Sequence, residues 1–218
     1  TFRLDLPASS EDALGGMVDA RFTDLPLSIA ESLLDLDGEL IQACGPVLTG
    51  SLKALGQGGK TTFESDWSAN RFTSQLSGTI DAERRVAVDG KTTITVTPHL
   101  ASRFGVELAV PVRLRAQPTA LNFPLPFDRT RLRGKVVLST EPVSLPRVDL
   151  KGVRLENEFE LLGIRTVLHC DAYTRDAELQ RWLGKKTSVL IQGHHHWRDE
   201  ATGASVVLLG DTVELRAE

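Results

Sequence analysis

The chain has 218 residues, of which 41% are hydrophobic and 25% are charged, and its formal net charge is −4. A chain of this length can bury a substantial core, as one large β domain or as two small ones. The negative charge argues against a bulk nucleic-acid binder. No apolar run reaches the length of about 18 residues that a membrane-spanning helix needs. Because the sequence begins at Thr1 and not at methionine, we expect it to be part of a longer chain.

The first residues predict a short strand. Phe2, Leu4 and Leu6 alternate with charged residues, as in a strand with one buried face. The stretch that follows, residues 9–22, contains serine and acidic residues before an apolar group. It predicts a short helix or a turn.

Two helices are predicted next. Residues 27–36 carry apolar side chains on one side, and Ser28 and Glu31 have the spacing of a capping box. Residues 39–44 predict a second short helical turn, which Gly45 ends. We expect these helices to cover one end of a sheet.

From Val47 onward the apolar period changes to two residues, which predicts strands. Asp89 and Gly90 form the preferred dipeptide of a tight turn and predict a hairpin within "VAVDGKTTITV". The glycine-rich stretch Gly56–Lys60 lacks the spacing of a phosphate-binding loop and indicates a hairpin tip. Because no crossover helices separate these strands, we expect an antiparallel sheet.

The clearest alternation lies in "RFGVELAVPVRLRAQP", which predicts one long strand. Pro111 cannot donate a ladder hydrogen bond, so we expect an edge strand or a bulge there. A further alternating run, "RLRGKVVLST", follows a proline-punctuated connection. The apolar residues expected to line the buried face of these two strands are Val106, Leu108, Val110, Val112, Leu114, Val136 and Leu138.

Near the C-terminus, a strand over residues 164–173 leads into a short helix. Thr174 is the expected N-cap and Gly184 the expected stop signal. The sequence as a whole predicts a mainly β fold, an antiparallel sheet that is curled or sandwich-like, with two or three short helices. We expect residues 1–148 to form a β-sheet domain with an N-terminal capping helix. Residues 149–218 are expected to form a smaller β domain, or a continuation of the sheet, with one short helix.

Few residues point to chemistry. His194 and His196 share one face of a predicted strand, and they are the candidates for a zinc site. A third ligand would come from His169, Asp199 or Glu200. The tight ligand clusters that mark zinc sites are absent, so the favoured interpretation is a solvated strand end without metal. We expect no catalytic residues and no cofactor.

The remaining candidates are cysteines and arginines. Cys44 and Cys170 lie far apart in the sequence, and we expect two small buried apolar residues, with a disulfide as the alternative. Arg129, Arg131 and Arg133 alternate at the start of a predicted strand. They can line a basic face for phosphate headgroups or nucleic acid, but a solvated face offset by nearby acids is the favoured interpretation.

Three segments resemble large bacterial envelope proteins of the AsmA-like type. They are "LPLSIAESLLDLDGELIQACGPVLTGSLKALG", "SGTIDAERRVAVDGKTTITVTPHLASRF" and "PLPFDRTRLRGKVVLSTEPVSL", within residues 25–150. The shared pattern is a short helix, a leucine-aspartate-glycine turn, alternating strands and a proline-and-aspartate linker. The resemblance implies a non-enzymatic, elongated sheet with an apolar groove, a location in the cell envelope or periplasm, and lipid or envelope components as partners.

The C-terminal third is similar in pattern to the second half of bacterial single-stranded-DNA-binding proteins. That likeness implies an oligonucleotide-binding module in which Tyr173, Trp182 and Trp197 stack on bases. Charge argues against it, because acids outnumber lysines and arginines by 12 to 9 from Asp149 to Glu218. Nucleic-acid binding is therefore the alternative to the lipid-handling function.

Overall fold

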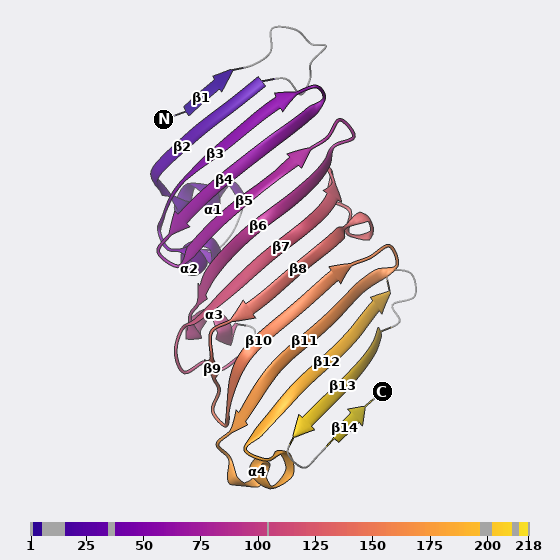
Figure 1. Ribbon diagram of the computed structural model, residues 1–218. Helices are drawn as coiled ribbons and strands as arrows, with labels where there is room; N and C mark the ends of the chain where they lie inside the picture. Colours follow the sequence, from indigo (N-terminus) through magenta and orange to yellow (C-terminus); the bar gives the residue numbers. More distant parts are fainter. Residues whose placement is uncertain are drawn as a thin grey trace. The chain divides into compact units, whose positions relative to one another are not determined.

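The computed structural model describes residues 2–5, 16–34, 38–103, 105–196, 202–210 and 214–217. The chain is mainly β, and short helices occupy some of the connections between strands (Figure 1). It divides into two compact units, which are described separately. Unit 1 comprises residues 1–95 and 117–133, and unit 2 comprises residues 96–116 and 134–218.

In unit 1, successive strands pair with one another in antiparallel fashion, in the order β1-β2-β3-β4-β5-β6-β7. Its elements are β1 (Phe2–Asp5), β2 (Gly16–Pro26), α1 (Leu27–Leu34), α2 (Glu39–Cys44), β3 (Val47–Gln57), β4 (Lys60–Ala69), β5 (Phe72–Ile80), most of β6 (Arg85–Val96), the second part of β7 (Val112–Pro124) and the 3-10 turn η1 (Arg129–Arg131).

In unit 2 the strand order is β7-β8-β10-β11-β12-β13-β14, and the short β9 pairs with β10. Its elements are α3 (Pro98–Ser102), the first part of β7, β8 (Arg133–Thr140), β9 (Val143–Ser144), β10 (Val148–Phe159), β11 (Gly163–Thr174), α4 (Ala177–Leu183), β12 (Lys186–His196), β13 (Thr202–Gly210) and β14 (Glu214–Ala217).

The two-residue period of the sequence produces these strands. Along β4 the exposed and half-buried residues alternate, with Phe63 and Trp67 half-buried and Glu64 and Asp66 exposed. The turn from β3 to β4 consists of Gly58 and Gly59, whose φ angles are 58° and 75°. Only glycine adopts such angles readily, so the predicted hairpin tip is confirmed.

Helices α1 and α2 form where the sequence predicts them and lie behind the strands of unit 1 in the view of Figure 1. The predicted capping box is wrong, because α1 begins at Leu27 and Ser28 lies inside it. The Glu31 carboxylate instead accepts a hydrogen bond from the Ile41 N–H at 2.9 Å and so joins the two helices. Gly45, with a φ of 110°, ends α2 as expected.

Two predictions in unit 1 are wrong. Within residues 9–22, the described part from residue 16 onward is strand β2 and not a helix, and residues 9–15 lie outside the described residues. Asp89 and Gly90 form no turn, because β6 continues through them. Gly90 has a φ of 147°, and a Cβ there would lie 2.1 Å from the Gln75 carbonyl oxygen. The glycine therefore permits a close approach between β5 and β6 and not a reversal of the chain.

The long strand predicted from Val106 is also wrong in its first half. Residues 106–111 are irregular, and β7 begins at Val112. Pro111 immediately precedes the strand, where its missing N–H is tolerated. The strand is not an edge strand, because β7 lies between β6 and β8 in the ladder.

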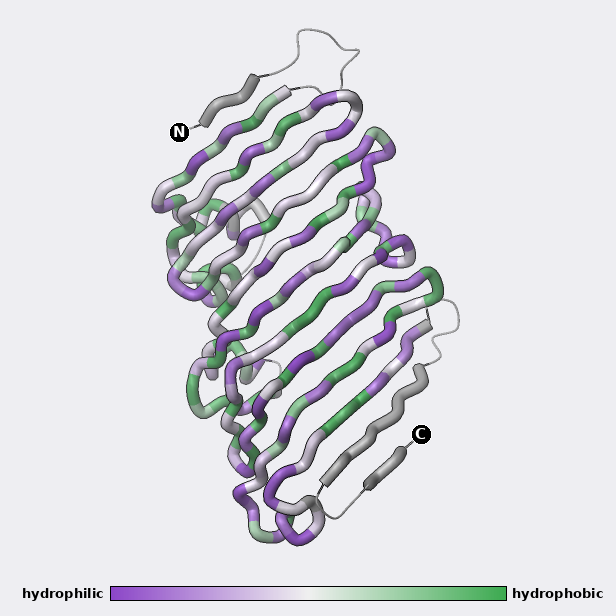
Figure 2. The backbone as a smooth tube through the Cα atoms, viewed as in Figure 1, coloured by the Kyte–Doolittle hydropathy of each residue, from purple (hydrophilic) through white to green (hydrophobic). Residues whose placement is uncertain are grey.

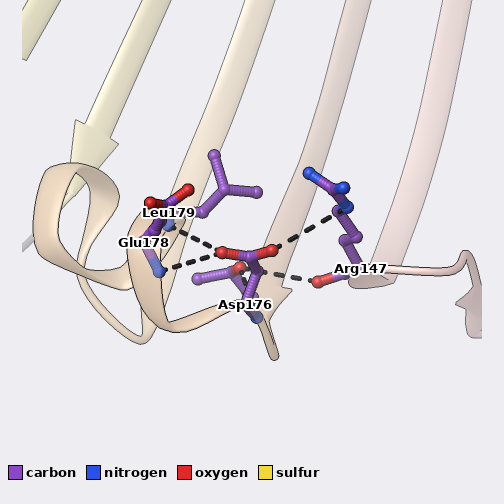
Figure 3. A network of polar contacts seen from close by, with 5 residues as sticks. Arg147, Asp176, Glu178 and Leu179 are labelled. Carbon is purple, nitrogen blue, oxygen red and sulfur yellow. Dashed lines mark hydrogen bonds and ion pairs between the residues drawn. The ribbon is translucent and has the colours of Figure 1, made fainter.

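Helix α4 is confirmed, but its cap is not Thr174, which ends β11. The Asp176 carboxylate accepts hydrogen bonds from the N–H groups of Glu178 at 2.9 Å and Leu179 at 3.1 Å (Figure 3). These bonds hold the pKa of Asp176 below its usual value, the bond from Leu179 most strongly. Gly184, with a φ of 73°, ends the helix.

The mainly β, antiparallel fold is thus confirmed, and the described strands follow one another in one pairing order. The described residues contain four short α-helices, against the two or three expected. The predicted boundary between residues 148 and 149 falls at the start of β10. The independence of the two expected domains stays a prediction.

Candidate functional site

The apolar face of unit 2 is the first candidate site. Residues directly opposite each other in an antiparallel ladder point to the same side, and Leu138, Leu155, Leu168 and Ile191 are opposite one another on β8, β10, β11 and β12. The register places further apolar residues on the same side, interrupted by the hydrogen-bonded pair Asn157 and Thr166. The apolar face of unit 2 comprises Val136, Leu138, Val148, Leu150, Leu155, Phe159, Ile164, Leu168, Cys170, Ala172, Val189 and Ile191.

Most of this surface is only half-buried. Cys170 is buried, with 5% exposure, whereas Leu138, Leu155 and Leu168 are of intermediate exposure. Among the residues that the structure describes, no large side chain falls below 2% exposure. Within the described part of unit 2, no element buries this face as fully as a second layer normally does.

Unit 1 has a face of the same kind. Leu52 lies between Ala20 and Ser65 in the ladder, and Leu76 follows on β5, so all four point to one side. Figure 2 shows the corresponding alternation of green and purple along these strands. The apolar face of unit 1 comprises Val18, Ala20, Phe22, Leu48, Leu52, Ala54, Phe63, Trp67, Ala69, Phe72, Leu76, Ile80, Val86, Val88 and Ile94.

Glycines shape the unit 1 face by leaving space that aromatic rings occupy. A Cβ at Gly50 would lie 2.5 Å from Cε3 of Trp67, and one at Gly78 would lie 2.6 Å from Cζ of Phe63. The Trp67 ring also stacks on Phe22, with 5.9 Å between the ring centroids. Sequence reasoning missed this arrangement, although the signal was present as glycines within alternating strands.

The opposite face of unit 2 carries ion pairs, with apolar residues such as Val137 and Val167 between them. Glu156 contacts Lys135 and also Arg154, the latter at 2.6 Å. The hydrogen bond from Lys135, followed by that from Arg154, lowers the pKa of Glu156. Asp171 accepts a hydrogen bond from Ser188 at 2.7 Å and lies 3.0 Å from Lys186. This face is suited to water, and the contrast with the apolar face makes the sheet of unit 2 amphipathic.

A hollow of about 620 Å³ opens over β2 to β6 in unit 1. Three consecutive rungs of the ladder line it, those that contain Asp19, Ala54 and Leu55. Its lining therefore mixes residues of both faces, as in a dip of the sheet surface and not in an enclosed cavity.

The predicted face-lining residues separate into two groups. Val136 and Leu138 lie on the apolar face of unit 2. On β7, Nη1 of Arg113 lies 3.5 Å from Oε1 of Glu141. The next residue, Leu114, points to the opposite side of the strand from this ion pair. Val112 is buried at 6% exposure and Leu114 is half-buried.

The other three predicted residues precede β7. Val106 and Val110 are 44% and 54% exposed, and Leu108 lies between them in the same irregular segment. They cannot share a strand face by alternation, because the segment is not a strand.

The structure assembles no metal site from the described residues. His194 is exposed on β12 opposite Arg165, and His169 lies opposite Leu190, four positions along β12. No group of three His, Cys, Asp or Glu side chains within the described part of the chain is placed to hold a metal ion. His196 lies on the same strand, and Asp199 and Glu200 lie outside the described residues.

Cysteines and arginines also have definite places. Cys44 and Cys170 are both free thiols, and burial raises the pKa of each. Arg129 and Arg131 lie in the turn η1 and not in a strand, while Arg133 begins β8. The predicted alternation of these three along one strand is therefore wrong.

No family model, no curated protein and no solved structure matches this chain. Over the part of the chain that the structure describes, no helix has the length and apolar character needed to cross a membrane. The site must therefore be interpreted from its own geometry.

Proposed function

We propose that the chain is a non-enzymatic β module of a larger bacterial cell-envelope protein and that its apolar faces bind the acyl chains of lipids. The observation that carries this proposal is the half-buried row Leu138, Leu155, Leu168 and Ile191, with ion pairs on the opposite face of the same strands. The resemblance to AsmA-like proteins supports the location in the envelope and the partners, which are lipids or envelope components.

The energetics favour an apolar occupant. Burying one CH₂ group contributes about 0.8 kcal/mol, so an acyl chain laid along several half-buried leucines gains a substantial free energy. Contiguous exposed apolar surfaces of soluble proteins mark interaction sites. In unit 1, the Phe63 and Trp67 rings occupy the space above Gly78 and Gly50 and add aromatic area to the apolar face.

Two neighbouring residues of β11 provide a matched test. Leu168 lies on the apolar face, and Val167 points to the opposite face beside Glu156 and Gln192. We expect Leu168→Glu to lose most of the lipid that co-purifies with the protein, measured by mass spectrometry. Val167→Lys, which places a charge on the opposite face and directly opposite Glu156, should retain it.

Circular dichroism must show that both variants fold, and Leu168→Ser serves if the glutamate variant does not. Equal lipid content in the folded apolar-face and control variants, or no lipid on the parent protein, would contradict the proposal.

Single-stranded nucleic-acid binding by the C-terminal third is the second candidate. Trp182 is 73% exposed, and the Lys151 and Lys186 ammonium groups lie 4.5 Å and 5.8 Å from the centroid of Tyr173. Trp197 lies outside the described residues. Salt-dependent retention on single-stranded DNA, lost in Trp182→Ala, would favour this function over lipid binding.

A further inference from the structure

An arginine-lined hollow lies in unit 1, away from the apolar face. It has a volume of about 170 Å³, and its lining residues are Arg85, Asn122, Pro124, Arg131 and Arg133. Arg85 begins β6, and the other two arginines belong to η1 and the start of β8. Segments far apart in the sequence thus bring three arginines to one small concavity.

One backbone hydrogen bond joins two of these segments, and side-chain hydrogen bonds hold Arg133 in place. The Leu125 N–H donates to the Arg84 carbonyl oxygen at 2.8 Å, which joins the end of β7 to the start of β6. The Arg133 Nη1 donates to the carbonyl oxygens of Thr130 at 2.8 Å and Leu132 at 2.6 Å. The guanidinium of Arg133 is therefore oriented by its own turn before any ligand arrives.

Three carboxylates lie near the hollow, and one of them, Asp81, accepts a hydrogen bond from the Arg85 N–H at 2.8 Å. Glu83 pairs with Arg85 at 2.6 Å, and Asp128 caps η1 by accepting hydrogen bonds from Thr130. These bonds, and beyond them the charges of Arg131 and Arg129, lower the pKa of Asp128. With Arg84 and Arg129, which lie beside the same turns, five arginines face three carboxylates, so the local charge is positive.

We propose that this hollow binds a phosphate group. Guanidinium groups present planar pairs of N–H donors that match phosphate oxygens, and phosphate carries more charge at pH 7 than a carboxylate. Asn122 adds an amide donor on the wall. The site is independent of the acyl-chain proposal, because Arg85 alternates with Val86, which lies on the apolar face at 6% exposure.

The phosphate can belong to a soluble molecule or to a lipid headgroup. Two exposed apolar residues beside η1, Leu125 at 42% exposure and Phe127 at 62%, would contact a lipid surface but not a free anion. Phe127 stands edge-on to Phe123, with 5.8 Å between their ring centroids. The Phe127→Ser variant therefore distinguishes the two sources.

The first experiment titrates inorganic phosphate into the protein while the Nε–H resonances of arginine are followed by NMR. We expect saturable shifts for Arg131 and Arg133. Arg131→Gln and Arg85→Gln should each weaken binding about tenfold, the scale of one charge-assisted hydrogen bond. Arg113→Gln, which removes an exposed arginine from the Glu141 pair in unit 2, should leave the affinity unchanged.

The second experiment measures sedimentation with phosphatidylcholine vesicles that contain phosphatidic acid, against vesicles without it. Binding that Arg131→Gln and Phe127→Ser both abolish supports the site with a lipid source. Phosphate binding that Phe127→Ser leaves intact supports it with a soluble source. Should neither probe bind, or should Arg113→Gln weaken binding as much as Arg131→Gln, the proposal is overturned.

Discussion

Individual side chains decide how closely the strands of unit 1 approach one another. Gly78 has no side chain, and the Phe63 ring occupies the space above it. A Cβ at this position would lie 2.1 Å from the Ala87 carbonyl oxygen, which belongs to the backbone of the next strand. The conflict cannot be relieved by a side-chain rotation, so the strand itself must shift.

We therefore expect Gly78→Ala to lower the free energy of unfolding by about 1–3 kcal/mol, the usual effect of overpacking. Urea denaturation measures it. Ser77→Ala, one position earlier on the opposite and exposed face, is the control and should have little effect. A Gly78→Ala protein as stable as the parent would show that Phe63 does not lie over the glycine.

The ion pairs of Glu156 predict a pH dependence. The folded protein holds the pKa of Glu156 below its usual value of 4.5, through Lys135 and then Arg154. A depressed pKa contributes stability above the unfolded-state value, and this stability is lost as the pH falls through the folded-state value. The denaturation midpoint should therefore fall on acidification below about pH 4.5, and less steeply in Glu156→Gln.

Glu107→Gln, in the exposed segment before β7, controls for the loss of one carboxylate. If the two variants show the same pH profile, the pairing of Glu156 contributes nothing measurable.

At the scale of elements, helix α4 depends on a cap that the sequence reasoning misplaced by two residues. Thr174 and Asp176 are both acceptable N-cap residues, and only the backbone shows that β11 runs through Thr174. Asp176 then accepts the two N–H bonds of Figure 3, and its other oxygen lies 3.8 Å from Arg147.

Replacing Asp176 with alanine should cost about 1 kcal/mol of stability, as expected for a lost N-cap. Urea denaturation, with Asp176→Ser as the variant that restores a capping oxygen, measures this effect. Thr174→Val removes no hydrogen bond to the N–H groups of Glu178 or Leu179, so it should leave α4 capped. Equal destabilisation by Asp176→Ser and Asp176→Ala would contradict the capping role.

The prediction of a hairpin at Asp89 and Gly90 was wrong for a similar reason, because the local residues are compatible with more than one structure. The turn between β5 and β6 lies earlier, where the Arg84 N–H donates to the Asp81 carbonyl oxygen at 3.0 Å and the Arg85 N–H to Oδ1 of Asp81 at 2.8 Å. Asp89 instead accepts a hydrogen bond from the Ala120 N–H at 2.7 Å. An Asp-Gly dipeptide is compatible with a tight turn and with a close contact between strands. The contacts with neighbouring strands determine which of the two forms.

At the scale of the molecule, each unit is an amphipathic antiparallel sheet whose apolar face is half-buried. A ligand that covers such a face binds the folded chain and not the unfolded one, so it must raise the unfolding midpoint. At a free ligand concentration of 100 times the Kd, the gain is about 2.7 kcal/mol per site.

We expect a long-chain fatty acid to raise the thermal midpoint of the parent protein and to have a smaller effect on Leu168→Ser. Differential scanning calorimetry against ligand concentration provides the measurement. If the fatty acid does not change the thermal midpoint, the proposal that the apolar faces bind acyl chains is contradicted.

The sequence alone determined the strand-rich, antiparallel character, the positions of α1, α2 and α4, and the Gly58–Gly59 hairpin, because these follow from local periodicity and backbone preferences. The tertiary structure decided what depends on partners distant in the chain. The register shows that Leu138 and Leu168 share a row with Leu155 between them. Other tertiary contacts show that aromatic rings lie over Gly50 and Gly78 and that Arg85 lines one hollow with Arg131 and Arg133. Alternation tells which residues of one strand share a face, but cross-strand hydrogen bonds alone determine which neighbours they meet.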